Sequence, residues 1–303
     1  MNSKTLVQLV LVLLIGIAAI FGRNLWQNYR AHQPNNYLQY VQGFDKDNPI
    51  YINLAQQGQS LTFIKKDGSW QVASKSADLA KVDELVASFL PTTSPIIVGE
   101  SQQLQENFSL TKDTAKVVTL KDGSGKTLTI WIGNSTGTET TVRIPDQTTI
   151  YGLRNLPTIS FDPHQWFNLD VVDIDSKDIK NLTFSSANGS FEADQIEDGK
   201  WQFKDDQESK INNDGLNTFV MKLNPLVSEN LVLEPELQEY TFGNPIFSLA
   251  IGKSNGETVS LDFYDVGEET YLLKRSIDNQ YFSLSSYSAD ELNKTKDSFV
   301  MVE

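Results

Sequence analysis

The feature that most constrains this chain is an internal repeat with a spacing of about 130 residues. Six segments recur in the same order: Ser60–Phe63 as Asn181–Phe184, Gly68–Val72 as Gly199–Phe203, Leu104–Glu106 as Leu237–Glu239, Thr127–Ile130 as Thr258–Leu261, Thr140–Arg143 as Thr270–Leu273, and Ile150–Tyr151 as Gln280–Tyr281. The first pair is closer together than the others by about ten residues, so an insertion of that size near residues 188–198 is inferred in the second copy. We therefore predict two tandem homologous modules, residues 59–164 and 165–303.

Each copy has the pattern of an α+β module, in which one helix packs over an antiparallel sheet. A hairpin is expected around Asp67-Gly68, and a meander of strands is expected from Lys116 to Leu153. Between them, apolar residues recur at helical spacing and a proline follows: Leu79, Val82, Val86, Phe89 and Pro91 in one copy, Leu216, Phe219, Val220, Leu223 and Pro225 in the other. The paired Trp70 and Trp201 are interpreted as core anchors.

The N-terminus carries an apolar segment that predicts a membrane anchor. The 18 residues 5–22 would span about 27 Å as a helix, close to the thickness of a bilayer core. A signal peptide cleaved after Gly16-Ile17-Ala18 is the alternative, and a buried helix is a third reading. We assign residues 1–22 to a transmembrane anchor and residues 23–58, rich in Gln and Asn, to a solvated stalk. A short N-terminus before a long acidic body favours a body outside the bacterial cytoplasm.

The charge balance and the residue inventory exclude several classes of function. The chain has 25 Lys+Arg against 39 Asp+Glu, an acidity that opposes binding to nucleic acid. There is no cysteine, so disulfides and thiol nucleophiles are excluded. Only His32 and His164 are histidines, which excludes a site with several His ligands. No metal or cofactor is expected.

One motif resembles a catalytic site. Residues 133–137 fit the G-x-S-x-G pattern, with Ser135 as the nucleophile, and His164 beside Asp162 would have to supply the base. That motif needs a helix after the serine, whereas a β-pattern follows here. We therefore expect a hairpin loop, and keep a hydrolase using Ser135 as an alternative.

Two other patterns suggest ion or phosphate binding only superficially. Residues 125–127 and 252–254 resemble the end of a phosphate-binding loop but lack its first glycine and precede strands, which predicts turns. Residues 173–178 resemble a calcium loop but lack its remaining ligands, so an acidic connector is expected. The sequence therefore predicts no catalytic, cofactor-binding or metal-binding residues.

The order of these features resembles the family called domain of unknown function 4340. The resemblance is carried by residues 68–72, 76–79, 108–110, 128–133 and 150–151, and by the connector from Trp166 to Ile174. It covers about residues 59–303 and is less clear in the second copy. Relatives in this family include accessory subunits of gliding-motility-type ABC transporters, so it implies a possible accessory role outside the cytoplasmic membrane. It supplies no catalytic residues.

The leading hypothesis is therefore a non-enzymatic, membrane-tethered protein that binds protein partners in the cell envelope, as an accessory of a transporter or an envelope assembly. The alternative is a module that binds a glycan or a small ligand through exposed aromatics such as Trp131 or Tyr264. A deep aromatic-lined cleft would favour the ligand module, whereas a flat surface with an apolar patch would favour protein binding.

Overall fold

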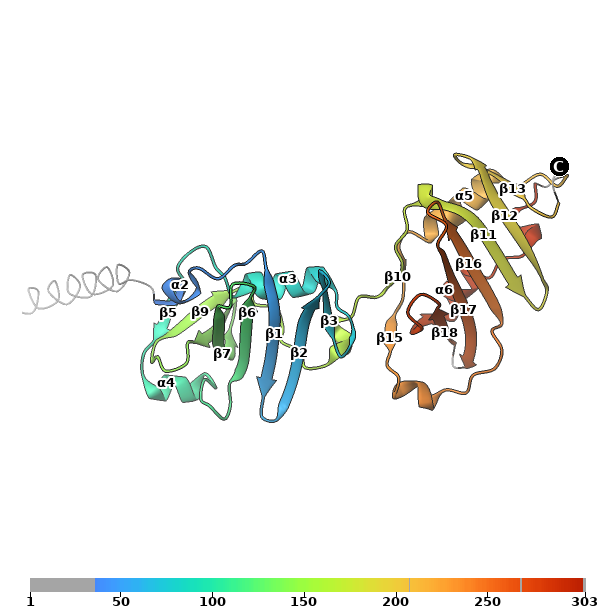
Figure 1. Cartoon of the computed structure of the whole chain (residues 1–303). Helices are drawn as coiled ribbons and strands as arrows, with labels where there is room; N and C mark the ends of the chain where they lie inside the picture. The colour runs from blue at the N-terminus through green and yellow to red at the C-terminus, as the bar shows by residue number, and fades with distance from the viewer. Residues whose placement is uncertain (1–35, 207, 268, 302–303) are drawn as a thin grey trace, which may run out of the picture. The chain divides into compact units, whose positions relative to one another are not determined.

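The computed structural model describes residues 36–206, 208–267 and 269–301, which form two large antiparallel sheets with few helices (Figure 1). The sheet-rich α+β class predicted from the sequence is confirmed. The chain divides into two compact units. Among the described residues, one comprises residues 36–62 together with Asp83–Ile159, and the other comprises Phe63–Val82 together with the residues from Ser160 to 301.

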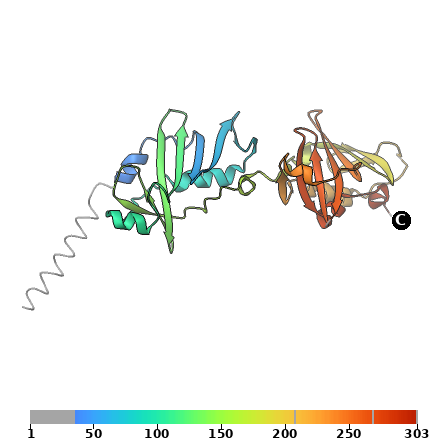
Figure 2. The ribbon, with the colours of Figure 1, turned by 90° about the horizontal axis from the view of Figure 1, so that it is seen from below.

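The first sheet has nine strands in the order β4-β3-β2-β1-β6-β7-β8-β9-β5. They are β1 (Pro49–Gln56), β2 (Gln59–Lys66), β3 (Ser69–Val72), β4 (Lys75–Ser76), β5 (Ile96–Gly99), β6 (Lys116–Asp122), β7 (Thr127–Thr136), β8 (Glu139–Arg143) and β9 (Ile150–Arg154). The helices of this part of the chain are α2 (Asn36–Val41), α3 (Leu79–Ser88) and α4 (Gln102–Asn107). Figure 2 shows α3 running along one face of the sheet.

The second sheet has eight strands in the order β13-β12-β11-β16-β17-β18-β19-β15. They are β11 (Ile179–Ser186), β12 (Gly189–Glu197), β13 (Lys200–Phe203), β15 (Asn230–Val232), β16 (Phe247–Lys253), β17 (Thr258–Gly267), β18 (Thr270–Arg275) and β19 (Gln280–Ser285). A separate two-stranded sheet pairs β10 (Asp170–Val172) with β14 (Leu226–Val227). The helices are α5 (Asn213–Lys222), α6 (Ser286–Leu292) and the short 3-10 helices η1 (Pro163–Trp166), η2 (Ser176–Asp178), η3 (Glu236–Glu239) and η4 (Lys296–Phe299).

Core residues alternate along the strands, as the pleat of a half-covered sheet requires. In β17 the buried residues are Val259, Leu261 and Phe263, while the residues between them face the other side. Phe219 of α5 packs against Phe184 of β11 with ring centroids 5.3 Å apart. Trp70 and Trp201 are buried at 1% and 4% exposure, which confirms both as core residues.

Apart from β4, the two sheets have the same strand order, and their registers show which residues correspond. Lys65 pairs with Trp70 across β2 and β3, and Gln195 pairs with Trp201 across β12 and β13. The offset in sequence from Lys65 to Gln195 is one residue shorter than the offset between the two tryptophans. The extra residue is Ile196, which lies in a β-bulge between Gln195 and Glu197.

This register overturns the insertion of about ten residues inferred near residues 188–198, because a single bulged residue replaces it. The predicted match of Ser60–Phe63 with Asn181–Phe184 is wrong, because these segments lie in β2 and β11, which are not corresponding strands. β11 lies between β12 and β16 as β1 lies between β2 and β6, so the counterpart of β11 is β1. β1 and β2 have a similar alternation of buried and exposed residues, so the sequence pattern alone cannot tell which of them corresponds to β11.

The match of Thr140–Arg143 with Thr270–Leu273 is wrong by one residue. Val142 pairs with Ile132, and Leu273 pairs with Phe263. Ile132 and Phe263 have the same offset in sequence as the two tryptophans and hold the same place in their sheets, so Val142 corresponds to Leu273. The match of Ile150–Tyr151 with Gln280–Tyr281 is also wrong by one residue. Tyr151 pairs with Val142 and Phe282 pairs with Leu273, so Tyr151 corresponds to Phe282. A slip of one residue would place side chains on the opposite face of the sheet.

The solvated stalk predicted for residues 23–58 is wrong for the part that the structure describes, which begins at Asn36. β1 is an inner strand of the nine-stranded sheet, with Ile52 and Leu54 fully buried. Tyr37 of α2 is also buried, and its hydroxyl donates to Phe89 O at 3.1 Å. The first sheet therefore begins before residue 59, the boundary predicted for its module.

The predicted transmembrane anchor, residues 1–22, and stalk residues 23–35 lie outside the described residues. Between residues 36 and 301, no described helix has both the length and the apolar character needed to cross a bilayer.

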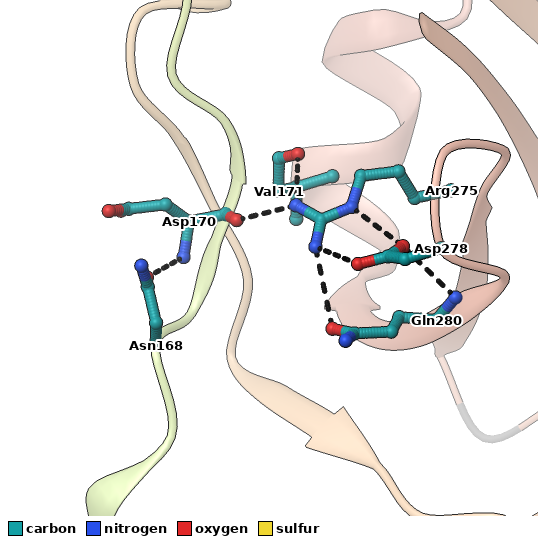
Figure 3. A network of polar contacts seen from close by, with 6 residues as sticks. All are labelled: Asn168, Asp170, Val171, Arg275, Asp278 and Gln280. Atoms are coloured by element: carbon teal, nitrogen blue, oxygen red, sulfur yellow. Dashed lines mark hydrogen bonds and ion pairs between the residues drawn. The ribbon is translucent and has the colours of Figure 1, made fainter. Parts of the chain in front are cut away.

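The segment that leads into the second sheet is held by Arg275 of β18 (Figure 3). Its guanidinium donates to Asp170 O at 2.9 Å and to Val171 O at 2.7 Å, and it forms an ion pair with Asp278 at 2.7 Å. Asn168 Oδ1 accepts a hydrogen bond from the Asp170 N–H at 2.8 Å. β10 is thus fixed by backbone pairing to β14 and by a charged donor on its carbonyls.

We predict that the two core tryptophans respond differently to substitution by phenylalanine. The Trp201 indole N–H donates to Asn217 Oδ1 at 2.9 Å, whereas the Trp70 Nε1 is buried with no hydrogen-bond partner among the described residues. Trp201→Phe should therefore lose about 1 kcal/mol more of unfolding free energy than Trp70→Phe. Denaturant unfolding measures both, and an equal loss at the two sites would contradict the prediction.

We predict that Asp170→Asn stabilises the protein at pH 7. Burial, followed by the nearby Asp173 and Asp78 carboxylates, raises the pKa of Asp170, while Arg275 lowers it. A raised pKa means that the Asp170 carboxyl binds its proton more tightly in the folded state than in the unfolded state. At pH values above the folded pKa, the charged carboxylate therefore lowers the unfolding free energy of the protein. The gain in melting temperature should disappear as the pH falls below about 4. Asp198→Asn, at an exposed residue, removes the same charge and is the control, since an equal gain there would attribute the effect to net charge.

Candidate functional site: an aromatic patch on the eight-stranded sheet

The face of the eight-stranded sheet opposite its main core carries an ordered set of side chains. Tyr264 of β17 pairs with Leu272 of β18, which pairs with Ser283 of β19. One step along, Asp262 pairs with Lys274, which pairs with Tyr281. Because directly paired residues share a face, the two tyrosines lie diagonally across Leu272 and Lys274.

The connection from β15 to β16 places an aromatic ring over these residues. The Phe242 ring lies 5.5 Å from the Tyr264 ring in an edge-to-face arrangement, and 5.4 Å from the Tyr281 ring. Leu272 beneath this face is completely buried, whereas Phe242 and Ile246 remain 37% and 36% exposed. We call Phe242, Ile246, Tyr264 and Tyr281 the aromatic patch.

Polar and charged groups surround the aromatic patch. Ser248 Oγ donates to Asp262 Oδ1 at 2.6 Å, and Lys274 Nζ lies 5.8 Å from the centroid of the Tyr281 ring. Burial raises the pKa of Tyr264, and the neighbouring Asp262 adds to this effect. Residues 233–246 contain three glutamates and no lysine or arginine. The patch is therefore apolar at its centre, has Asp262 and Lys274 beside it, and is crossed by an acidic connection.

On the corresponding face of the nine-stranded sheet, a backbone segment takes the place of the aromatic side chains. Gly133 follows Ile132 as Tyr264 follows Phe263, so it occupies the place of Tyr264, and a Cβ there would lie 2.1 Å from Phe108 O. The Asn134 N–H donates to this same carbonyl at 2.9 Å, and Arg143 donates to Leu110 O at 3.1 Å. The connection from β5 to β6 is thus pinned against the strands here, which a tyrosine at residue 133 would prevent.

Trp131, the other aromatic residue considered for ligand binding, is partly covered by this arrangement. The Arg143 guanidinium lies over its ring at 4.3 Å. This cation–π contact uses a ring face that a sugar would need for stacking. Tyr264 therefore lies in a partly exposed aromatic cluster, whereas the Trp131 ring is covered on one face by Arg143, its pairing partner across β7 and β8.

The residues of the serine motif have other partners. Ser135 lies inside strand β7, and its hydroxyl is 3.0 Å from that of Thr140 on β8. His164 bonds to Asn230 at 2.9 Å and Glu236 at 2.8 Å, while the Asp162 carboxylate accepts from the backbone N–H of His164 at 3.0 Å. Asp162 therefore orients the chain rather than the imidazole. A strained strand-to-helix elbow at Ser135 is absent, because β7 continues through it into a hairpin.

The remaining motifs lie in turns or strand ends. Gly125 has a positive φ of 92° in the turn between β6 and β7, which confirms a turn there. The turn predicted at residues 252–254 is wrong for its first two residues, because Gly252 and Lys253 lie in β16; Lys253 forms an ion pair with Glu257 at 2.7 Å. In the calcium-like segment, Asp175 caps η2 by accepting from Lys177 N. Among the described residues, no group of three His, Cys, Asp or Glu side chains is placed to hold a metal ion.

Phe242 and Tyr281 were not identified as site residues from the sequence. The signal available was the aromatic Tyr240 after the short helix η3, which matches Phe108 after α4. The sequence does not show that the following residues fold back over β17 and β19, because that contact is non-local.

Comparison with known proteins identifies the family. The model of a family described as domain of unknown function (DUF4340) matches residues 70–245, more than half of the chain. The chain belongs to the DUF4340 family. No curated protein and no solved structure matches it. The DUF4340 match ends just before β16, so it includes Phe242 but not the two tyrosines of the aromatic patch.

We predict that Gly133→Ala destabilises the protein by about 1–3 kcal/mol, because the added methyl group would overlap the Phe108 carbonyl, a backbone atom fixed by a hydrogen bond. Gly243→Ala is the matched control, since nothing lies within 4 Å of its Cβ position. It should change the unfolding free energy by less than about 0.5 kcal/mol. Denaturant unfolding compares the two, and equal effects would show that the close approach at Gly133 is unimportant.

Proposed function

We propose that this DUF4340 protein is a non-enzymatic, membrane-tethered protein outside the bacterial cytoplasm, which binds protein partners as an accessory of a transporter or an envelope assembly. The observation that carries the proposal is the aromatic patch, where Phe242 and Ile246 are exposed beside Tyr264 and Tyr281. Tethering rests on the apolar segment of residues 5–22.

The chemistry of the patch favours a protein partner. Aromatic side chains supply most of the binding energy in many protein interfaces, when polar groups at the rim exclude water around them. The acidic loop of residues 233–246 favours a partner whose own rim is basic. A ligand-binding module has weaker support, because the described residues that line the hollow of about 400 Å³ near β5 and β9 include no aromatic side chain for a sugar to stack on.

We infer that the two sheets arose by duplication of one module. Besides strand order, equivalent turn contacts support this inference: Gly123 N donates to Asn48 O at 3.0 Å, and Ser254 N donates to Asp178 O at 2.8 Å. The two donors have the same offset in sequence as the two tryptophans, and the two acceptors the same offset as Lys65 and Gln195. The cores have kept the same positions while the outer face changed from Gly133 to Tyr264. The change at this position is consistent with a binding role for the outer face of the eight-stranded sheet.

The test is cross-linking followed by mass spectrometry on the full-length protein in its native membranes. We expect specific cross-linked partners for the wild type and their loss in the double variant Phe242→Ser and Tyr264→Ser. Tyr287→Ser is the matched control, because Tyr287 is 73% exposed but lies outside the patch. A protein found alone, or partners retained equally by all variants, would contradict the proposal.

A further inference from the structure

We propose that a hollow beside β5, at the edge of the nine-stranded sheet, binds an extended peptide segment of a partner protein. The hollow has a volume of about 400 Å³ and lies among residues 88–155. Its lining includes Thr92, Thr93, Ser94, Ile96, Glu139 and Arg154. It does not involve the aromatic patch, so the inference is independent of the function proposed above.

The corresponding edge of the eight-stranded sheet shows what kind of segment the hollow can bind. Ile96 pairs with Gly152 at the edge of one sheet, and Asn230 pairs with Ser283 at the edge of the other. Gly152 corresponds to Ser283, because each follows one of the corresponding residues Tyr151 and Phe282. Their pairing partners Ile96 and Asn230 therefore correspond as well. Counting back from this pair, Ser94 corresponds to Ser228.

Ser228 holds a strand. Both its backbone N–H and its hydroxyl donate to Leu169 O, at 2.9 and 3.0 Å, and the adjacent Val227 pairs with Asp170 of β10. Ser228 is consequently only 6% exposed. Ser94 retains the same two donors, yet it is exposed and forms no hydrogen bond with the described part of the chain. Within the part of the chain that the structure describes, the hollow therefore presents the donors of a strand-binding site without the strand.

The described part of the chain does not supply this strand itself. Counting back from the corresponding residues Asn48 and Asp178, the counterparts of β10 are residues 40–42, at the end of helix α2. The Gln42 N–H is already bonded to Leu38 O at 2.9 Å. Backbone in this helical conformation cannot pair with residues 92–94 as a strand does, so within the described part of the chain no segment takes the place of β10 beside them.

The lining indicates the chemistry of the occupant. A segment recognised mainly through its backbone would place an apolar side chain against Ile96, which is 50% exposed. A neighbouring acidic side chain would face Arg154, whose side chain is 71% exposed and forms an ion pair with Glu139. Asp170-Val171 of β10 has this alternation. Arg275, which donates to the carbonyls of β10, corresponds to Ile144 in the nine-stranded sheet. Without this charged donor, the hollow should bind a peptide more weakly than the eight-stranded sheet holds β10, and reversibly.

The test uses a synthetic peptide with the sequence of residues 166–174 as the probe and the full-length protein in detergent. Hydrogen–deuterium exchange should slow at residues 92–97 when millimolar peptide is added. Ser94→Pro removes both donors and should abolish the slowing, whereas Ser94→Ala removes one and should weaken binding about fivefold. Unchanged exchange in β8 and β9 would verify that the variants fold.

Three outcomes would overturn this inference: no slowing at millimolar peptide, slowing at another site, or equal binding by Ser94→Pro. A photo-cross-linker at residue 96 that reacts with residues 23–35 of the same chain would also overturn it, by showing that the chain itself occupies the hollow. Phe242→Ser should leave peptide binding unchanged, which separates this test from that of the aromatic patch.

Discussion

The structure depends on the register of antiparallel pairing in the two sheets. Because side chains alternate between faces, register decides which residues enter a core and which lie beneath the connection that crosses the other face. Leu272 and Leu273 are adjacent in β18 and both completely buried, which requires cover on both faces of the sheet. A strand shifted by one residue would exchange these environments along its whole length.

Within this common register, one position separates the two sheets. At Gly133 a backbone carbonyl approaches the strand so closely that no side chain fits, and the crossing connection is pinned by hydrogen bonds. At the corresponding Tyr264 a large ring occupies that space and packs against Phe242 instead. The second sheet consequently exposes aromatic surface where the first has a closed polar contact. A change of residue size thus accounts for a candidate binding surface without any change in strand order.

Much of the fold could be predicted from the sequence, because the tryptophans, the helices that end at proline and the later strands recur at nearly constant spacing. The first strand of each sheet could not be assigned in this way. Leu61-Thr62-Phe63 and Leu182-Thr183-Phe184 are identical tripeptides, but they belong to β2 and β11, and only the hydrogen-bonded neighbours distinguish them. The polar residues around β1 obscured the alternation of Ile52 and Leu54. The aromatic patch was also beyond sequence reasoning, except for Tyr264, because a connection as long as that of residues 233–246 can cross a sheet along many paths.

The repeated architecture also explains why the described part of the chain fills an edge of one sheet but not the corresponding edge of the other. The segment before the eight-stranded sheet is extended, so Leu169 and the carbonyls of Asp170 and Val171 can be held by Ser228 and Arg275. The corresponding segment before the nine-stranded sheet forms α2, and its backbone bonds are made within the helix. A serine whose two donors have no partner in the described part of the chain is then left at an edge whose counterpart binds a strand. Since unpaired strand edges invite pairing with other chains, this edge is a natural point for a partner to add its own backbone.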